Sequence, residues 1–254
     1  MSAFNRLIRS VVLRLKIRPK WARLGVWFRR ARDFRLRSIS VGIGNRVQFS
    51  FLEAERQVQK HEFRQIYLCD CYRLGEVRAS PATVVDVGGN VGLFSIVARQ
   101  RFPDALIHCY EPNPALTEIL NHNLFPLSVS VFSEAVSDHA GTVRLKLRKN
   151  SLETSVSDDP FGELPMISLD TAVERCGGRV DLLKLDCEGC EWSILENAVG
   201  LDAVKEITME FHLWAKRGST VEDLTSLLTR RGFQVVSIDK QPHQSWGMLH
   251  AKRA

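Results

Sequence analysis

The chain has 254 residues, of which 44% are hydrophobic and 25% are charged, and its formal net charge is +6. This composition is that of a globular protein, and the lack of any repeat, heptad or low-complexity tract excludes collagen-like, coiled-coil and wholly disordered chains. No window contains 18 uninterrupted apolar residues, so a conventional transmembrane helix is not expected. The six cysteines lack zinc-type spacing, and no secretory signal is visible, which favours a reduced, cytoplasmic protein.

The first 40 residues are strongly basic, since they hold twelve Lys and Arg against one acid, and the remainder therefore carries a net charge of −5. Apolar residues recur at helical spacing from Phe4 to Leu15, and Pro19 ends the predicted helix. A basic amphipathic segment suits an anionic membrane surface, so residues 1–37 are expected to attach there peripherally. Two alternatives remain open: the helix packs on the main domain, or the segment is an organellar transit peptide.

Strand-like and helical patterns alternate from about residue 82, which predicts an α/β fold with a doubly wound, mostly parallel sheet. The expected strands cover residues 82–87, 105–110, 129–136, 142–147, 180–186, 204–211, 233–238 and 248–251. The expected helices cover residues 92–101, 114–124, 191–198 and 220–231, and residues 149–163 are expected to form a loop. We expect an arm with its lead-in over residues 1–54 and one catalytic domain over residues 55–254.

Polar residues follow the carboxyl ends of successive strands, where ligands bind in sheets of this kind. The first strand ends in Asp86, and the turn after it contains Gly88, Gly89, Asn90 and Gly92. The second ends in Glu111, Pro112 and Asn113, the third near Glu134 and Ala135, the fourth at Asp186 and Glu188, and the fifth at Glu210 and His212. Each feature alone is compatible with a structural role, but an acid after the second strand can accept both ribose hydroxyls of a nucleoside.

The turn argues against a dinucleotide as the ligand. Asn90 occupies the second glycine position of the G-x-G-x-x-G pattern, where the backbone must approach a pyrophosphate. Asp86 adds negative charge that would repel a phosphate and attract a cationic group. S-adenosylmethionine has no phosphate and carries a sulfonium and an α-ammonium, so it fits this turn better.

At these residues the chain resembles the FkbM-type family of S-adenosylmethionine-dependent methyltransferases. The segments that carry the resemblance are residues 84–95, 110–114, 137–141, 168–170, 181–191 and 209–212. The resemblance covers about residues 55 to 251 and departs from the family where Gly89 and Cys190 replace the commoner Ala. It implies a class I Rossmann-like fold with seven strands and methyl transfer to a hydroxyl of a sugar, glycan, lipid or other natural product.

This resemblance implies a role for each group of residues. The turn from Gly88 to Gly92, with Asp86, is expected to surround the methionyl part of the cofactor, and Glu111 to bind the ribose. Pro112 and Asn113 are counted with the cofactor-binding residues. Glu134 and the backbone of Ala135 are expected to contact the adenine, and Asp186 is counted with the cofactor-binding residues.

Candidate catalytic residues lie at the ends of the fourth and fifth strands. His212 is expected to be the general base, because a neutral imidazole is the usual state near pH 7, and Glu210 would orient it. Asp186 and Glu188 are the alternative base or acceptor-positioning pair. These acids could also hold a divalent cation, but no diagnostic metal spacing is present, so no metal ligand is assigned.

The basic arm leaves a different class of function open, an RNA methyltransferase or a nucleic-acid-binding protein. The remainder of the chain carries net negative charge and contains no recognised RNA-reading motif, so nucleic acid is not the expected partner. A small-molecule, glycan or lipid acceptor is the expected one.

Overall fold

The computed structural model describes residues 27–30, 33–35, 39–40, 46–47, 49–51, 55–77, 80–146 and 155–253. The chain divides into two compact units, residues 1–50 and residues 51–254, whereas the sequence places the boundary after residue 54. In the first unit, β1 (Trp27–Arg30) pairs antiparallel with β2 (Asp33–Arg35), and β3 (Ile39–Ser40) pairs with β4 (Arg46–Val47).

The helix predicted over residues 4–15 lies outside the described residues, and so does most of the segment predicted to attach to a membrane surface. That attachment therefore stays a prediction. In the described part of the chain, no helix combines the length and the hydropathy needed to cross a membrane.

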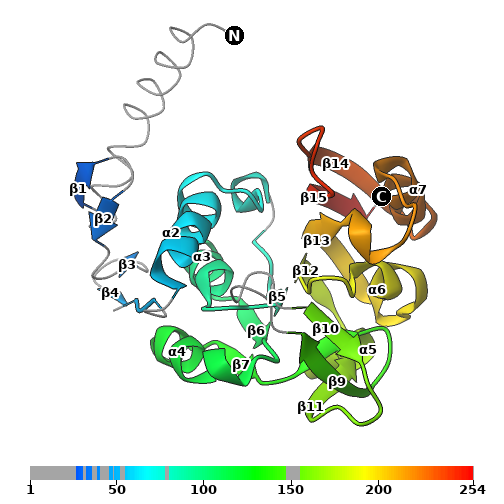
Figure 1. The fold of residues 1–254 in the computed structure, drawn as a ribbon, viewed down its shortest axis with the longest axis horizontal. Helices are drawn as coiled ribbons and strands as arrows, with labels where there is room; N and C mark the ends of the chain where they lie inside the picture. The colour runs from blue at the N-terminus through cyan, green and yellow to red at the C-terminus, as the bar shows by residue number, and fades with distance from the viewer. Residues whose placement is uncertain are drawn as a thin grey trace, which may run out of the picture. The chain divides into compact units, whose positions relative to one another are not determined.

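A seven-stranded sheet with the order β14-β15-β13-β12-β5-β6-β7 forms the centre of the second unit (Figure 1). Its strands are β5 (Thr83–Val87), β6 (Leu106–Tyr110), β7 (Ser130–Phe132), β12 (Val180–Leu185), β13 (Val204–His212), β14 (Phe233–Asp239) and β15 (Trp246–Arg253). Neighbouring strands are parallel except for the two pairs that β15 makes. The predicted mostly parallel, seven-stranded class I methyltransferase fold is confirmed.

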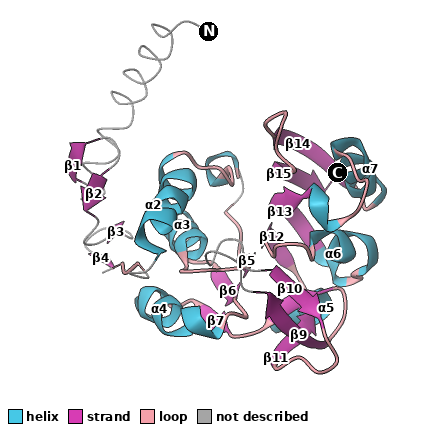
Figure 2. Cartoon of the chain, viewed as in Figure 1, coloured by secondary structure: helices cyan, strands magenta, loops and turns pink. Residues whose placement is uncertain are grey.

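Helices cover both faces of this sheet, as a doubly wound fold requires. One side carries α2 (Arg56–Phe63), α3 (Leu93–Arg101) and α4 (Pro114–Leu124), and the other carries α5 (Leu169–Arg175), α6 (Glu191–Asn197) and α7 (Val221–Arg230) (Figure 2). A π-helical segment, η2 (Arg64–Leu68), continues α2, and the 3-10 turns are η3 (Leu74–Glu76), η4 (Phe125–Leu127), η6 (Gly200–Ala203) and η7 (Leu213–Ala215).

Local sequence signals explain where several helices begin. The Asn113 side chain accepts the N–H of Ala115, and Pro114 takes the first helical position of α4. Thr220 and Asp223 form a capping box at the start of α7. The predicted helix boundaries at these two places are therefore correct to within one residue.

A smaller sheet with the order β10-β9-β11-β8 corrects two predictions. Its strands are β8 (Ala135–Ser137), β9 (Gly141–Lys146), β10 (Ser155–Asp158) and β11 (Leu164–Ser168). The single strand predicted over residues 129–136 is two strands, β7 and β8, which belong to different sheets. The predicted loop over residues 149–163 contains β10, which pairs antiparallel with β9.

The central strands are buried, which explains their continuous apolar runs. Val84 and Val85 of β5 and Leu182, Leu183 and Leu185 of β12 have no exposed surface. Because these parallel strands all end at the same edge of the sheet, the polar residues that follow them are brought together there.

Candidate active site

The turn after β5 has the tight backbone that its glycines predict. Gly88 has φ +80° and Gly92 has φ +89°, and a Cβ atom at Gly88 would overlap the carbonyl oxygen of Asp186. The N–H groups of Gly88 and Gly89 donate to the Tyr110 carbonyl at 2.9 and 3.0 Å. The turn is thus packed between the ends of β6 and β12, and only glycine fits at position 88.

Glu111 ties the end of β6 to this turn. Its Oε2 accepts the N–H of Asn90 and its Oε1 accepts the N–H of Asn113, each at 2.9 Å. Burial raises the pKa of the Glu111 carboxyl. Each carboxylate oxygen can accept a further hydrogen bond, so both remain available to ligand hydroxyls.

Asn90 offers an unpaired acceptor beside Glu111. Its backbone has φ 48°, and its side-chain Oδ1 is buried with no hydrogen-bond partner among the described residues. An unpaired buried amide oxygen is costly, by about 1–3 kcal/mol. The α-ammonium of S-adenosylmethionine is a donor that would satisfy it, so the residues present fit this cofactor.

A pocket opens at the carboxyl ends of β5, β6 and β12. It is lined by Glu62, Val87, Gly88, Asn90, Tyr110, Glu111, Pro112, Glu134, Ala135, Val136, Leu145, Asp186, Cys187 and Glu188. We call it the cofactor pocket. The structure brings seven of the predicted cofactor-binding residues to its wall: Gly88, Asn90, Glu111, Pro112, Glu134, Ala135 and Asp186.

The other predicted cofactor-binding residues, Asp86, Gly89, Gly92 and Asn113, lie behind this wall. A Cβ atom at Gly89 would overlap Cys109 Sγ, and one at Gly92 would lie 2.9 Å from Leu124. Asn113 caps α4 and donates its N–H to Glu111. These three residues therefore shape the wall.

Among these residues, Asp86 departs most from the prediction, which placed it beside the methionyl part of S-adenosylmethionine. It has no exposed surface, and its oxygens lie 2.7 Å from Ser95 Oγ and 3.3 Å from Lys184 Nζ. Lys184 in turn donates to the carbonyl oxygens of Val87 and Gly88 at 3.2 and 2.7 Å. Asp86 thus holds the turn through Lys184, because a buried carboxylate requires a cationic partner.

Glu134 reaches the cofactor pocket already engaged in an ion pair. Both of its carboxylate oxygens accept hydrogen bonds from Arg175, and the Arg175 guanidinium lies over the Phe132 ring at 4.7 Å. Contact of the Glu134 side chain with adenine stays a prediction. Arg175 is a pocket-supporting residue that the sequence analysis missed.

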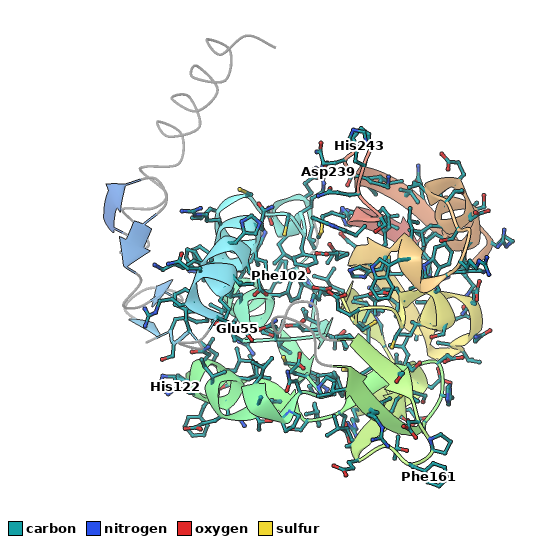
Figure 3. The ribbon with its side chains drawn as sticks, in the orientation of Figure 1. Glu55, Phe102, His122, Phe161, Asp239 and His243 are labelled. Carbon is teal, nitrogen blue, oxygen red and sulfur yellow. The ribbon has the colours of Figure 1, made fainter. Side chains whose placement is uncertain are left out.

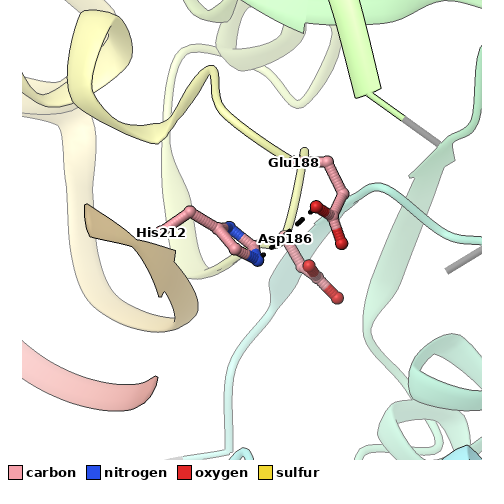
Figure 4. A group of neighbouring side chains, drawn as sticks. All are labelled: Asp186, Glu188 and His212. Atoms are coloured by element: carbon pink, nitrogen blue, oxygen red, sulfur yellow. Dashed lines mark ion pairs between the residues drawn. The ribbon is translucent and has the colours of Figure 1, made fainter. Parts of the chain in front are cut away.

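The predicted catalytic residues meet at the ends of β12 and β13, and Figure 4 shows three of them, Asp186, Glu188 and His212. His212 Nε2 lies 3.6 Å from Glu188 Oε2 and 3.5 Å from Glu210 Oε1. Asp186 joins them and accepts a hydrogen bond from the Tyr72 hydroxyl at 2.8 Å. We call Asp186, Glu188, Glu210 and His212 the acid–histidine cluster.

The charge of His212 differs from the expectation. Burial lowers the pKa of its imidazole, but hydrogen bonds with Glu191 and Glu210 outweigh burial and raise the pKa to about 11. Burial also raises the pKa of Glu188 to about 8. An imidazole that already carries its proton at neutral pH cannot accept another, so the reason given for His212 as general base does not hold in this arrangement.

The structure adds three residues that the sequence analysis missed. Glu191, at the start of α6, accepts from His212 Nδ1 at 3.0 Å. Tyr72 binds Asp186, and Glu62, near the end of α2, lines the cofactor pocket with a carboxyl whose pKa burial raises to about 8. Glu191 lies within segment 181–191, one of the segments that carry the family resemblance, so the sequence offered a signal for it. Residues 55–77 carry no strand pattern that would have indicated Glu62 or Tyr72.

A second pocket lies between residues 65–76 and the β14–β15 hairpin. It is lined by Gln65, Cys69, Asp70, Cys71, Arg73, Glu76, Asp239, Gln241, Gln244, Trp246 and Met248. Trp246 and Met248 of β15 pair directly with His212 and Glu210 of β13. Directly paired residues carry their side chains on the same face of a sheet, so this pocket begins beside the cluster. We call it the acceptor pocket, after the role that is proposed for it below.

Comparison with known proteins gives the family. The model of the methyltransferase FkbM domain matches residues 86–235. The chain is 26% identical over 221 residues to methyltransferase sdnD of Sordaria araneosa, with 68% of this chain and 81% of that protein covered. It is 27% identical over 215 residues to 31-O-demethyl-FK506 methyltransferase FkbM of Streptomyces tacrolimicus, with 69% and 82% covered. The chain belongs to the FkbM methyltransferases and is an S-adenosylmethionine-dependent methyltransferase.

Proposed function

We propose that this methyltransferase acts on a hydroxyl oxygen of a polar, polyhydroxylated acceptor such as a sugar, a glycan or a glycosylated lipid or natural product. The observation that carries this proposal is that the acid–histidine cluster adjoins two pockets. Asp186 and Glu188 line the cofactor pocket, while Glu210 and His212 are paired in register with Met248 and Trp246 of the acceptor pocket.

The cofactor pocket supplies the contacts that hold the donor. Glu111 would bind the ribose hydroxyls, and Asn90 Oδ1 would accept from the α-ammonium. When bound, S-adenosylmethionine supplies a methyl group on a sulfonium, which is a good leaving group. The chain must therefore align the acceptor oxygen behind that methyl group and remove its proton.

Glu210 is the residue that we assign to proton removal. It belongs to the strand that borders the acceptor pocket, its side chain is partly exposed, and burial together with Asp186 raises the pKa of its carboxyl. In the reaction the acceptor O–H bond breaks and its proton passes to Glu210. The new O–C bond forms as the C–S bond breaks, and a neutral thioether leaves. His212 and Glu191 then act as positioning residues for Glu210.

The lining of the acceptor pocket supports a polyhydroxylated acceptor. Three glutamine amides, several charged groups and one aromatic ring, that of Trp246, face it. Amides donate hydrogen bonds to hydroxyl groups and accept them, carboxylates accept them, and an aromatic face packs against the C–H side of a sugar ring.

The proposal is tested by incubating the full chain with S-adenosylmethionine that carries a 13C methyl group and with fractionated extract of the source cells. We expect a product that gains one methyl group, whose carbon shift in NMR spectra is that of an O-methyl ether. A label found on nitrogen, on sulfur or in RNA would contradict the proposal.

Changing Glu111 to Gln is expected to weaken S-adenosylhomocysteine binding about 10- to 100-fold, because a charge-assisted pair of hydrogen bonds to the ribose becomes a neutral one. Titration calorimetry measures this affinity. Glu118→Gln is the matched control, since Glu118 is exposed on α4. Equal affinities for Glu111→Gln and wild type would show that Glu111 does not bind the ribose.

Changing Trp246 to Ala is expected to raise the KM for the acceptor up to about tenfold and to leave kcat nearly unchanged. The reason is that an aromatic contact contributes about 0.5–1.5 kcal/mol of binding free energy, equally to the bound substrate and to the transition state. Steady-state kinetics with the acceptor found by labelling checks this. Phe161→Ala is the control, because Phe161 is 85% exposed and lies at the opposite end of the domain from Asp239 of the acceptor pocket (Figure 3). An unchanged KM in Trp246→Ala would rule out this pocket as the acceptor site.

A further inference from the structure

We propose that Asp186, Glu188 and His212 bind one divalent cation of the Mg²⁺ or Mn²⁺ type, which contacts the acceptor hydroxyl during methyl transfer. This inference rests on the proposed function, because it gives the ion a role in activating that hydroxyl. An ion bound there would lower the pKa of a coordinated hydroxyl and fix its oxygen in place.

The geometry of the three side chains carries the proposal. One ligand atom from each of Asp186, Glu188 and His212 lies within 4.8 Å of the other two, and Figure 4 shows the three side chains converging. Ligands about 2.1 Å from a common ion are separated by about 3 to 4.2 Å in octahedral geometry. Small side-chain rotations therefore suffice to bring all three onto one ion.

His212 is already held in the orientation that a metal ligand needs. Its Nδ1 is bound by Glu191 Oε1 at 3.0 Å, and Glu191 is 1% exposed. The two Glu191 oxygens also accept the backbone N–H groups of Cys187 and Gly189, at 3.1 and 3.0 Å. A carboxylate fixed on one ring nitrogen is the usual arrangement behind a metal-binding histidine, since it leaves the other nitrogen, Nε2, pointing at the ion. The ion would take the place of the proton that Nε2 carries in its absence.

Glu62 provides an independent sign that a cation belongs here. It comes from α2, on a different part of the chain, and lines the same pocket as Asp186 and Glu188. Its Oε2 is buried and has no hydrogen-bond partner among the described residues. A buried carboxyl oxygen without a hydrogen-bond partner is costly, and a cation in the pocket would stabilise the ionised form of this group.

The buried cationic side chain of Lys184 does not supply the missing partner of Glu62. Lys184 is 3% exposed, and its Nζ is engaged by Asp86, by two backbone carbonyls and, at 3.6 Å, by Asp186. Carboxylates therefore outnumber the cationic side chains around Asp186. Two carboxylates and one imidazole form a ligand set that Mn²⁺ accepts, which makes Mn²⁺ a suitable probe.

The test is a titration of the full chain with MnCl₂, after the protein has been treated with a chelator and transferred to fresh buffer. Binding is measured as the loss of the electron paramagnetic resonance signal of free Mn²⁺. We expect one Mn²⁺ per chain and at least tenfold weaker binding in Glu188→Gln and Asp186→Asn. Glu191→Gln is expected to weaken binding to a smaller degree through His212. Circular dichroism checks that each variant is folded.

The controls are Glu196→Gln and His139→Ala, which change a partly exposed acid and an exposed histidine outside the cluster and should bind Mn²⁺ as the wild type does. The proposal is wrong if the wild type binds no Mn²⁺, or if the folded Glu188→Gln and Asp186→Asn variants bind it as tightly as the wild type. Methyl transfer to a hydroxyl that persists in excess EDTA would also overturn it while leaving the proposed function intact. If the chain binds Mn²⁺ but its product is methylated on an atom other than oxygen, the proposed function is wrong. The ion then has no role in hydroxyl activation, and only the cation site remains.

Discussion

Replacing Glu210 with Gln is expected to lower kcat about 10²- to 10⁴-fold, while S-adenosylhomocysteine binds with unchanged affinity. The amide keeps the size of the carboxylate but cannot accept the acceptor proton. Because Glu210 is absent from the wall of the cofactor pocket, donor binding should not change. Single-turnover kinetics with labelled donor measures the chemical step, and calorimetry measures the affinity.

Glu196→Gln is the matched control for this experiment. Glu196 lies on α6, is about one-third exposed and pairs with Lys216, outside both pockets. Its single-turnover rate should equal that of the wild type. Wild-type turnover in Glu210→Gln would exclude Glu210 as the general base and would return the choice to Asp186 or Glu188.

Replacing Gly88 with Ala is expected to abolish measurable S-adenosylhomocysteine binding and to destabilise the fold by about 3 kcal/mol or more. The φ of +80° alone costs an L-residue about 1–2 kcal/mol. The added Cβ would also overlap the backbone oxygen of Asp186, which cannot rotate away as a side chain does. The turn and the loop after β12 must therefore separate, and both line the cofactor pocket.

Gly177→Ala separates the cost of the positive φ from the cost of the Cβ overlap. Gly177 has the same φ, +80°, but a Cβ there would meet no atom within 4 Å. This variant should lose only about 1–2 kcal/mol of unfolding free energy and bind the ligand as the wild type does. Urea unfolding and calorimetry of both variants check the comparison. Equal losses in the two would mean that the close approach at Gly88 has no energetic consequence.

The sequence predicts most of the central sheet because its strands are buried on both faces and therefore read as continuous apolar runs. The same signal fails over residues 129–136. There the predicted strand includes the polar residues Ser133 and Glu134, at which the chain leaves the main sheet, and β8 then enters the smaller one. β10 was missed for another reason, because its residues Ser155–Asp158 are mostly polar and its pairing with β9 is seen only in the structure.

The position of the site was predictable because parallel strands end at one edge, so Asp186, Glu188, Glu210 and His212 had to lie near one another. The charge state of His212 was not predictable. It depends on the Glu191 carboxylate, which contacts the imidazole. Glu191 follows a turn in which Glu188 has φ 52°, and the conformation of this turn brings Glu191 to His212. Glu62 was hidden because α2 is largely polar in sequence and gives no apolar signal.

The transferred methyl group is expected to lie between the cofactor pocket and the acceptor pocket, beside the acid–histidine cluster. A crystal structure of the full chain with S-adenosylhomocysteine tests this most directly. We predict that its ribose hydroxyls contact Glu111, that its α-ammonium contacts Asn90 Oδ1, and that its sulfur points toward Asp186 and Glu188. A ligand bound in another pocket, or one whose sulfur points away from Asp186 and Glu188, would contradict the proposed site of methyl transfer.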